Sequence, residues 1–192
     1  MSVKSFFRSG LYGIEKSFQA ARFASLPEPP SGWPILLGIS FPKSGTHLLD
    51  QILLGFAKVA PFSLRLHSFY AEYEGESGHK RGPEEAGAWL DSLQPRDVAS
   101  AHLFARPEAL GRVPTSDFLA YFVFRDPRDV AVSHAFYITE MAAGHAHHDY
   151  YTSLPDFDAR LRASILGRPD IAIEFPDIAA RFAPYAAWLE HA

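Results

Sequence analysis

Apolar residues alternate between strand-like runs and helix-like spacings through the central part of the chain. A mainly apolar run at 34–40 feeds a short polar loop, as a buried strand does. Apolar residues then recur every three or four positions, which predicts a helix over 45–58. The face of that helix expected to be buried carries five apolar side chains: Leu48, Leu49, Ile52, Leu53 and Phe56.

Two further strands and a second helix continue the alternation. A short strand near 97–101 precedes FLAYFVF at 118–124, whose unbroken apolar side chains predict a parallel strand covered on both faces. A helix over 127–140 begins after Asp126, a residue suited to cap it. Strands that alternate with helices predict an α/β fold with a parallel sheet flanked by helices.

The two ends of the chain have their own character. Residues 1–33 form a basic, amphipathic segment with a proline-rich lead-in. A terminal helix packed on the domain is the simpler interpretation of residues 1–25, and peripheral contact with a membrane is the other. Three prolines interrupt the helical pattern that begins near Asp156: Pro169, Pro176 and Pro184.

Composition limits the classes of function. With 192 residues and 47% hydrophobic content, the chain can bury one sizeable core, so residues 34–192 are expected to form one domain. The net charge of -4 gives no general attraction to nucleic acid, so an anion site has to be local. Cysteine is absent from the sequence, which excludes disulfides and thiol catalysis and predicts a cytoplasmic protein.

The loop FPKSGTHLL is suited to hold an anion. It joins the carboxyl end of the first strand to the amino end of the first helix, where backbone N–H groups and the helix dipole favour negative charge. A Walker loop has a glycine directly before its lysine, whereas Gly45 here follows Lys43 by two residues. Lys43 supplies a positive charge and Thr46 a hydroxyl donor. On this loop alone, an ordinary strand–helix turn with a surface lysine is the alternative.

A second stretch, FRDPRDVAVSH, adds an arginine at a strand end. Arg125 stands at the edge where ligands of open α/β sheets bind, and its planar guanidinium suits a phosphate. Ser133 follows two helical turns later, where its hydroxyl can add a bond from the flank. The alternative is that Arg125 pairs with Asp126 or Asp129 at the helix start, a role that suits Arg128 better.

Together the two stretches resemble a known pair of motifs. FPKSGTHLL is similar to the 5′-phosphosulfate-binding loop of sulfotransferases, and FRDPRDVAVSH resembles the same family's 3′-phosphate-binding segment. The motifs stand in the family's order, and Arg125 and Ser133 keep its spacing. The resemblance covers roughly residues 34–140. It implies a P-loop NTPase-like sulfotransferase fold and 3′-phosphoadenosine 5′-phosphosulfate (PAPS) as co-substrate, with no metal.

The resemblance also assigns roles to residues. It implies that Arg125 and Ser133 hold the 3′-phosphate and that Lys43 both binds the phosphosulfate and stabilises charge during transfer. His47, which stands with Leu48 where many members have Thr and Trp, is counted among the cofactor-binding residues. The loop residues expected to bind the co-substrate are therefore Lys43, Ser44, Gly45, Thr46 and His47.

Sulfuryl transfer also needs a base for the acceptor proton, and histidine titrates nearest neutrality. DVASAHLFARP places His102 just after the strand near 97–101, at the same sheet edge as both anion motifs. The segment is similar to the one in which many sulfotransferases carry their catalytic histidine. We predict that His102 is the base, with His47 or His134 as the next candidates. A histidine satisfied by a backbone carbonyl is the alternative.

Three other features are interpreted structurally. The stretch HKRGPEEAGAW is expected to be a surface loop. A cluster of aromatic residues can line an acceptor pocket but more often forms plain core: Phe62, Phe69, Tyr70 and Tyr73. Four residues of GHAHHDY are of metal-binding type but are expected to lie on a solvated, mobile loop: His145, His147, His148 and Asp149.

The sequence therefore predicts a sulfotransferase that moves a sulfuryl group from PAPS to an acceptor hydroxyl or amine. The acceptor can be a small molecule, a lipid or a carbohydrate, and nucleic acid is not expected as a partner. A P-loop kinase of a small metabolite is the first alternative, although no acidic residue clearly ends an apolar strand. A non-catalytic or degenerate nucleotide-binding module is the second.

The end of the chain carries a further expectation. AAWLEHA lies within an amphipathic helical pattern that has no capping glycine. The resemblance implies further elements downstream. The sequence therefore predicts a C-terminally incomplete domain that binds PAPS weakly and exposes apolar surface.

Overall fold

A computed structural model describes residues 32–69, 81–113, 115–168 and 175–191, together with residues 17, 18, 21, 23, 24 and 26. Most of the predicted N-terminal segment lies outside this part of the chain, as do Tyr70 and Tyr73 of the aromatic cluster.

Four parallel strands form one sheet, in the order β2-β3-β1-β4. Their bounds are β1 (Ile35–Ser40), β2 (Leu66–Phe69), β3 (Val98–Ala101) and β4 (Phe118–Val123). The predicted α/β class and the three predicted strands are confirmed. Strand β2 is additional; its four residues, LHSF, are too few to show a period.

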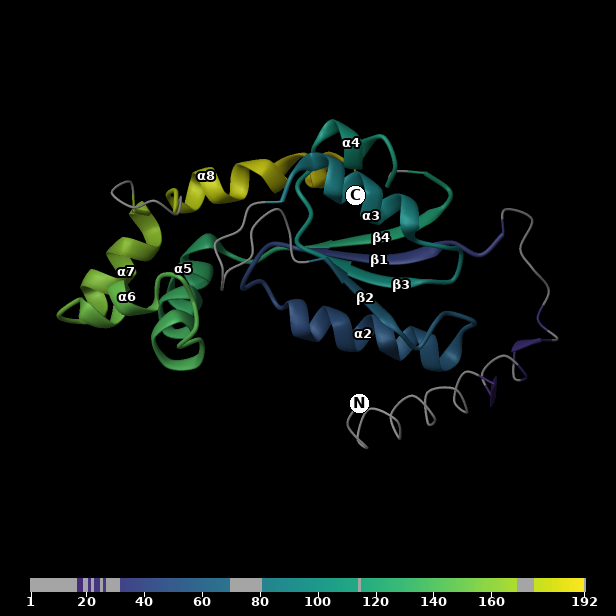
Figure 1. Cartoon of the computed structure of the whole chain (residues 1–192), viewed down its shortest axis with the longest axis horizontal. Coiled ribbons are helices and arrows are strands. Elements are labelled where there is room, and N and C mark those ends of the chain that lie inside the picture. Colours follow the sequence, from purple (N-terminus) through teal and green to yellow (C-terminus); the bar gives the residue numbers. More distant parts are fainter. Residues whose placement is uncertain are drawn as a thin grey trace.

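Helices cover the two faces of the sheet unequally (Figure 1). Helix α2 (Thr46–Val59) covers one face. The other face is covered by α3 (Pro83–Ser92), α4 (Pro107–Leu110) and a C-terminal 3-10 helix, η2 (Ala183–Glu190). Alternate residues of β1 point to opposite faces, so Leu37 joins the larger core cluster and Leu36 packs under α2.

The buried face of α2 differs from the predicted one. Its buried residues are Leu49, Asp50, Leu53 and Ala57. Leu48, Ile52 and Phe56, predicted to be buried, are 67%, 48% and 40% exposed. Helix α2 carries apolar side chains on two sides, and the spacing alone does not show which side meets the sheet.

Strand β4 is an edge strand and is not covered on both faces, contrary to the prediction. Phe118 and Phe122 pack against the larger core, whereas Leu119 and Tyr121 are exposed on the opposite face. Tyr121 stacks on Phe56 of α2 with ring centroids 6.5 Å apart. An exposed apolar surface therefore runs from α2 onto β4.

A group of helices lies beyond the carboxyl ends of the strands (Figure 1). It comprises α5 (Pro127–Phe136), a π-helical turn η1 (Tyr137–Met141), α6 (His148–Ser153) and α7 (Phe157–Leu166). Asp126 caps α5 as predicted, because its side chain accepts from the backbone N–H of Arg128. The helix predicted over 127–140 is α-helical only to Phe136, after which the backbone widens into η1.

The C-terminal part returns along α8 (Ile178–Phe182) to the α3 side of the sheet (Figure 1). It ends in the 3-10 helix η2, so the predicted amphipathic helix at AAWLEHA is wrong in type. Tyr185 and Trp188 are buried in the larger core, and Trp188 Nε1 donates to the carbonyl oxygen of Leu103 at 2.7 Å.

The stretch predicted as a surface loop before the third strand is partly helical. Helix α3 begins at Pro83, and the backbone N–H of Gly82 donates to Glu85 at 3.2 Å. Trp89 stacks on Phe69 with ring centroids 5.1 Å apart. The described part of the chain contains no helix that is long and apolar enough to cross a membrane.

Candidate functional site

The site forms where the chain leaves β1 and β3 on opposite faces of the sheet. The connection after β1 enters α2 on one face, and the connection after β3 enters α4 on the other. Neighbouring parallel strands with such connections leave a crevice at their carboxyl ends, where ligands of open α/β sheets bind. The loop of Lys43 and the residue His102 lie at this edge.

The backbone of the loop is bent tightly toward the start of α2. Lys43 has φ 67° and Gly45 has φ 106°, both in the left-handed region. Gly45 is the residue that precedes the first turn of α2, and a side chain at this φ would be strained. A strained lysine in a loop before a helix is typical of a backbone shaped for a ligand. Ser44 Oγ is buried and has no hydrogen-bond partner among the described residues.

Ser40, the last residue of β1, connects the loop to His102. Its side chain is completely buried. Its Oγ lies 2.9 Å from Oγ1 of Thr46, at the start of α2. The same Oγ lies 3.2 Å from Nδ1 of His102, and that Nδ1 lies 2.8 Å from the carbonyl oxygen of Ser40. The predicted base and the predicted anion loop are therefore joined through one residue.

The contact with Ser40 orients His102. A carbonyl oxygen only accepts hydrogen bonds, so Nδ1 carries the hydrogen and the neutral ring has its lone pair on Nε2. Burial lowers the pKa of His102, while the bond to Ser40 and the charge of Asp50 act in the opposite direction. A neutral histidine with its basic nitrogen on Nε2 can take a proton at neutral pH. The carbonyl contact expected of a purely structural histidine is also present, and it is compatible with both roles.

Lys43 reaches from the loop to the helices beyond the sheet. Its Nζ lies 3.5 Å from the centroid of the Tyr137 ring, in the π-helical turn after α5. Burial lowers the pKa of Lys43. The aromatic face stabilises the ammonium without a carboxylate that would compete with an anion.

The second predicted anion site comprises Arg125, which follows β4, and Ser133 on α5. Arg125 follows β4, and β4 pairs with β1 so that Val123 lies opposite Ser40. Arg125 Nε donates to Asp129 at 3.2 Å, and its side chain is about half exposed. Ser133, which is half-buried, lies one helical turn beyond Asp129 on α5.

Both arginines of this segment therefore take part in ion pairs. Arg128 binds Asp126, which is the role expected of it, and Arg125 pairs with Asp129. Arg128 holds the pKa of Asp126 at about 2.

His47 and His134, the alternative candidates for the base, do not share the surroundings of His102. His47 is exposed in the first turn of α2, and its charge acts against protonation of His102. His134 is buried: its Nδ1 lies 3.1 Å from Ser164 Oγ and its ring stacks on Phe175 at 5.0 Å. Burial holds the pKa of His134 well below its usual value. His134 thus belongs to the core of the helical group.

The histidine-rich stretch after α5 is packed, which corrects the predicted solvated, mobile loop. His147 is 1% exposed, and its ring lies 4.8 Å from that of Phe175 and 5.4 Å from that of His145. His148 begins α6, and its Nδ1 lies 2.7 Å from the carbonyl oxygen of Ile138. Aromatic packing therefore joins His145 and His147 to Phe175, which lies in the core of the helical group. Among the described residues, no group of three or more His, Asp or Glu side chains is arranged to hold a metal ion.

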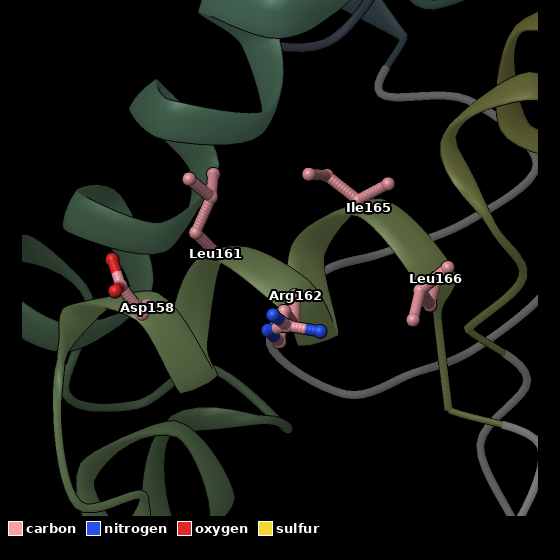
Figure 2. A pocket seen from close by; sticks show the side chains of 5 residues that line it. All are labelled: Asp158, Leu161, Arg162, Ile165 and Leu166. Carbon is pink, nitrogen blue, oxygen red and sulfur yellow. The ribbon is translucent and has the colours of Figure 1, made fainter.

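A hollow of about 410 Å³ lies elsewhere, on the surface of α7 (Figure 2). Its lining residues come from a single helix: Asp158, Leu161, Arg162, Ile165 and Leu166. Asp158 and Arg162 supply opposite charges, and none of the residues that meet at Ser40 contributes to it. We therefore place the candidate site at the sheet edge and not in this hollow.

The structure adds three residues that the motifs do not name. Ser40 is a hydroxyl that ends an apolar strand, and Asp50 is a carboxylate among the apolar residues of α2; both were visible as breaks in a pattern. Tyr137 lies three residues beyond FRDPRDVAVSH and carries no signal of its contact with Lys43, because that contact joins segments far apart in the chain.

Comparison with protein-family models, with curated proteins and with solved structures finds no match for this chain.

Proposed function

We propose that the protein is a PAPS-dependent sulfotransferase. The observation that carries the proposal is the link through Ser40, which joins the anion-binding loop and His102 within hydrogen-bond distances. A transferable anionic group and a base have to meet at one point for in-line transfer. The order β2-β3-β1-β4, with the loop after an inner strand, supports a P-loop-like fold.

The nucleotide is proposed to lie across the carboxyl edge of the sheet. The N-terminus of α2 and Lys43 bind the 5′-phosphosulfate, with Ser44, Thr46 and the open backbone at Gly45. Ser44 Oγ, which has no hydrogen-bond partner among the residues that the structure describes, supports this assignment. A buried hydroxyl without a hydrogen bond costs free energy unless a ligand supplies the partner. His47 lies next to these residues.

The other end of the nucleotide is assigned to α5. Arg125 and Ser133 take the 3′-phosphate, and Arg125 exchanges the Asp129 carboxylate for the phosphate.

In the proposed step the acceptor oxygen attacks the sulfur atom in line with the bridging oxygen. The new oxygen–sulfur bond forms as the bond from sulfur to the bridging oxygen breaks. Its electron pair leaves with adenosine 3′,5′-bisphosphate. The acceptor proton passes to Nε2 of His102, and Lys43 with the loop N–H groups stabilises charge on the sulfuryl and bridging oxygens.

The residues at the strand ends distinguish the proposed sulfotransferase from a P-loop kinase. The residues that directly follow β1, β2, β3 and β4 are Phe41, Tyr70, His102 and Phe124. A P-loop kinase holds Mg²⁺ with an acidic residue at such a strand end. A histidine in that position favours proton abstraction from an acceptor. A degenerate binding module has no need of an oriented base.

Transfer of labelled sulfate from PAPS to a panel of phenols, lipid alcohols, sugars and amines tests the proposal. We expect transfer that persists in a chelator. His102→Ala should lower turnover about 10²–10⁴-fold because the acceptor proton loses its base. Affinity for adenosine 3′,5′-bisphosphate should stay nearly constant, since His102 is not assigned to the nucleotide.

His67→Ala, on β2, is the control and should behave as the unmodified protein. Binding of the bisphosphate without transfer to any acceptor class would favour the degenerate module. ATP-dependent phosphorylation that requires Mg²⁺ would favour the kinase.

A further inference from the structure

Asp50 occupies a position on α2 that helix packing reserves for an apolar side chain. It lies in the buried face with Leu49, Leu53 and Ala57 and is 8% exposed. Its Oδ1 has no hydrogen-bond partner among the described residues. A buried carboxylate oxygen without a partner costs free energy, and a carboxylate close to an anion loop also weakens anion binding. Neither packing nor nucleotide binding therefore accounts for it.

Thr46 and Ser40 connect the face of α2 that carries Asp50 to His102, the proposed base. Thr46 precedes Asp50 by four residues, so the two side chains lie on the same face of α2. Thr46 binds Ser40, and Ser40 binds His102, so the face that carries Asp50 leads directly to the imidazole.

A second buried hydroxyl lies on the side of the sheet that faces α2. Ser100 on β3 is aligned with Gly38 of β1, and Gly38 faces Leu49 and Leu53 of α2 closely enough that an added Cβ would lie within 3 Å of both. Ser100 is 1% exposed, and among the described residues its Oγ has no partner. The mainly apolar layer between α2 and the sheet therefore contains one buried polar side chain from each side, Asp50 of α2 and Ser100 of β3.

We propose that Asp50 is a positioning residue for His102: its buried carboxylate stabilises the positive charge that the imidazole acquires when it accepts a proton. The proposal rests on the function proposed above. In that reaction the acceptor proton ends on Nε2, and the charge spreads over a ring that is partly withdrawn from water. A negative charge nearby stabilises that state more than the neutral one.

The charged surroundings of His102 agree with this assignment. Lys43, on the loop, and His47, in the first turn of α2, both act against its protonation. Asp50 acts in favour of it, as does the bond to the carbonyl oxygen of Ser40, and burial opposes both. Loss of Asp50 would leave the bond to Ser40 as the remaining contribution in favour of protonation.

Asp50→Asn tests the proposal, because it removes the charge and keeps the shape. We expect the pKa of His102, followed by NMR of its ring and identified with His102→Gln, to fall. Turnover at neutral pH should fall about three- to tenfold because the base is weaker. The free energy of unfolding should stay constant or rise, since a buried charge has been removed. A purely structural role predicts the reverse: lower stability and an unchanged titration of His102.

Asp50→Leu provides a second variant in case the amide disturbs packing. It restores an apolar residue to the buried face and should lower the pKa of His102 in the same way. Asp91→Asn, which removes an exposed charge paired with Arg112, is the control and should leave the titration of His102 and the turnover unchanged.

An unchanged His102 titration in both Asp50 variants would overturn the proposal, whether or not the protein turns over PAPS. A lowered pKa of His102 in Asp50 variants of a protein that transfers no sulfuryl group would support the coupling of Asp50 to His102. The same result would contradict the proposed reaction.

Discussion

Arg125 donates to Asp129 from an exposed position at the start of α5, and this contact bears on its proposed role. An exposed ion pair contributes only about 0.2–1 kcal/mol. A phosphate offers more acceptor oxygens and a higher charge than one carboxylate, so it can displace Asp129. The observed ion pair is therefore compatible with phosphate binding.

Arg125→Ala should weaken adenosine 3′,5′-bisphosphate by roughly 10–100-fold, as expected for a lost charge-assisted contact. AMP, which has no 3′-phosphate, should lose little. Calorimetry with both ligands measures the difference. Arg128→Ala is the matched control, because Arg128 is exposed and pairs with Asp126 in the same segment. Equal losses for both nucleotides, or equal losses in both variants, would remove Arg125 from the site.

At the scale of the element, α2 depends on one glycine of the strand beneath it. A Cβ added at Gly38 would lie 2.7 Å from Leu53 Cδ1 and 2.8 Å from Leu49 Cδ2. Both leucines are buried and have little room to move. Gly38 therefore lets α2 approach β1, and this approach sets the height of the anion loop above the strand.

Two glycine substitutions should have opposite effects on stability. Gly38→Ala is expected to destabilise the fold by about 1–3 kcal/mol, because it overpacks the contact with α2. Gly55→Ala, inside α2, meets no atom within 4 Å and should stabilise it by about 0.5–1 kcal/mol through helix propensity. Urea unfolding of both variants gives the two values. A Gly38→Ala protein as stable as the unmodified chain would show that α2 is not held at this distance.

For the whole molecule, buried histidines couple stability to pH. Burial lowers the pKa of His102, His134 and His145, and it lowers that of His147 to about 4. An unfolded histidine titrates near pH 6.5. Below that pH the unfolded chain binds protons that the folded protein does not, so the folded state loses stability as pH falls.

We expect the free energy of unfolding to drop between pH 7 and pH 5, with each such group contributing up to about 1.4 kcal/mol per pH unit below 6.5. Urea midpoints across this range measure the slope. His147→Gln should flatten it, whereas His191→Gln, at an exposed position, should not. Asp126 adds to the loss only below about pH 4, because its pKa is about 2. A midpoint that rises on acidification would contradict this account.

Local patterns were sufficient for much of the fold. Apolar runs predicted β1 and β4, and a short strand was predicted at β3. The spacing of apolar residues predicted α2, and the capping residue Asp126 predicted the start of α5, because these signals depend on neighbours in the chain. The same signals do not show which elements pack against one another. The buried side of α2 and the edge position of β4 depend on which elements meet. Of the predicted buried face of α2 only Leu49 and Leu53 are buried, and the prediction that β4 is covered on both faces was wrong.

The same distinction between local pattern and tertiary packing applies to the candidate site. The amino-acid sequence by itself determined that Lys43, Arg125 and His102 each stand at the end of a strand, because chain order and strand direction suffice for that. Only the tertiary structure decided that Ser40 binds both Thr46 and His102, and that Asp50 faces the sheet beneath them. The contact between Ser40 and His102 joins positions 62 residues apart in the sequence. All of these contacts form only when α2, β1 and β3 pack together.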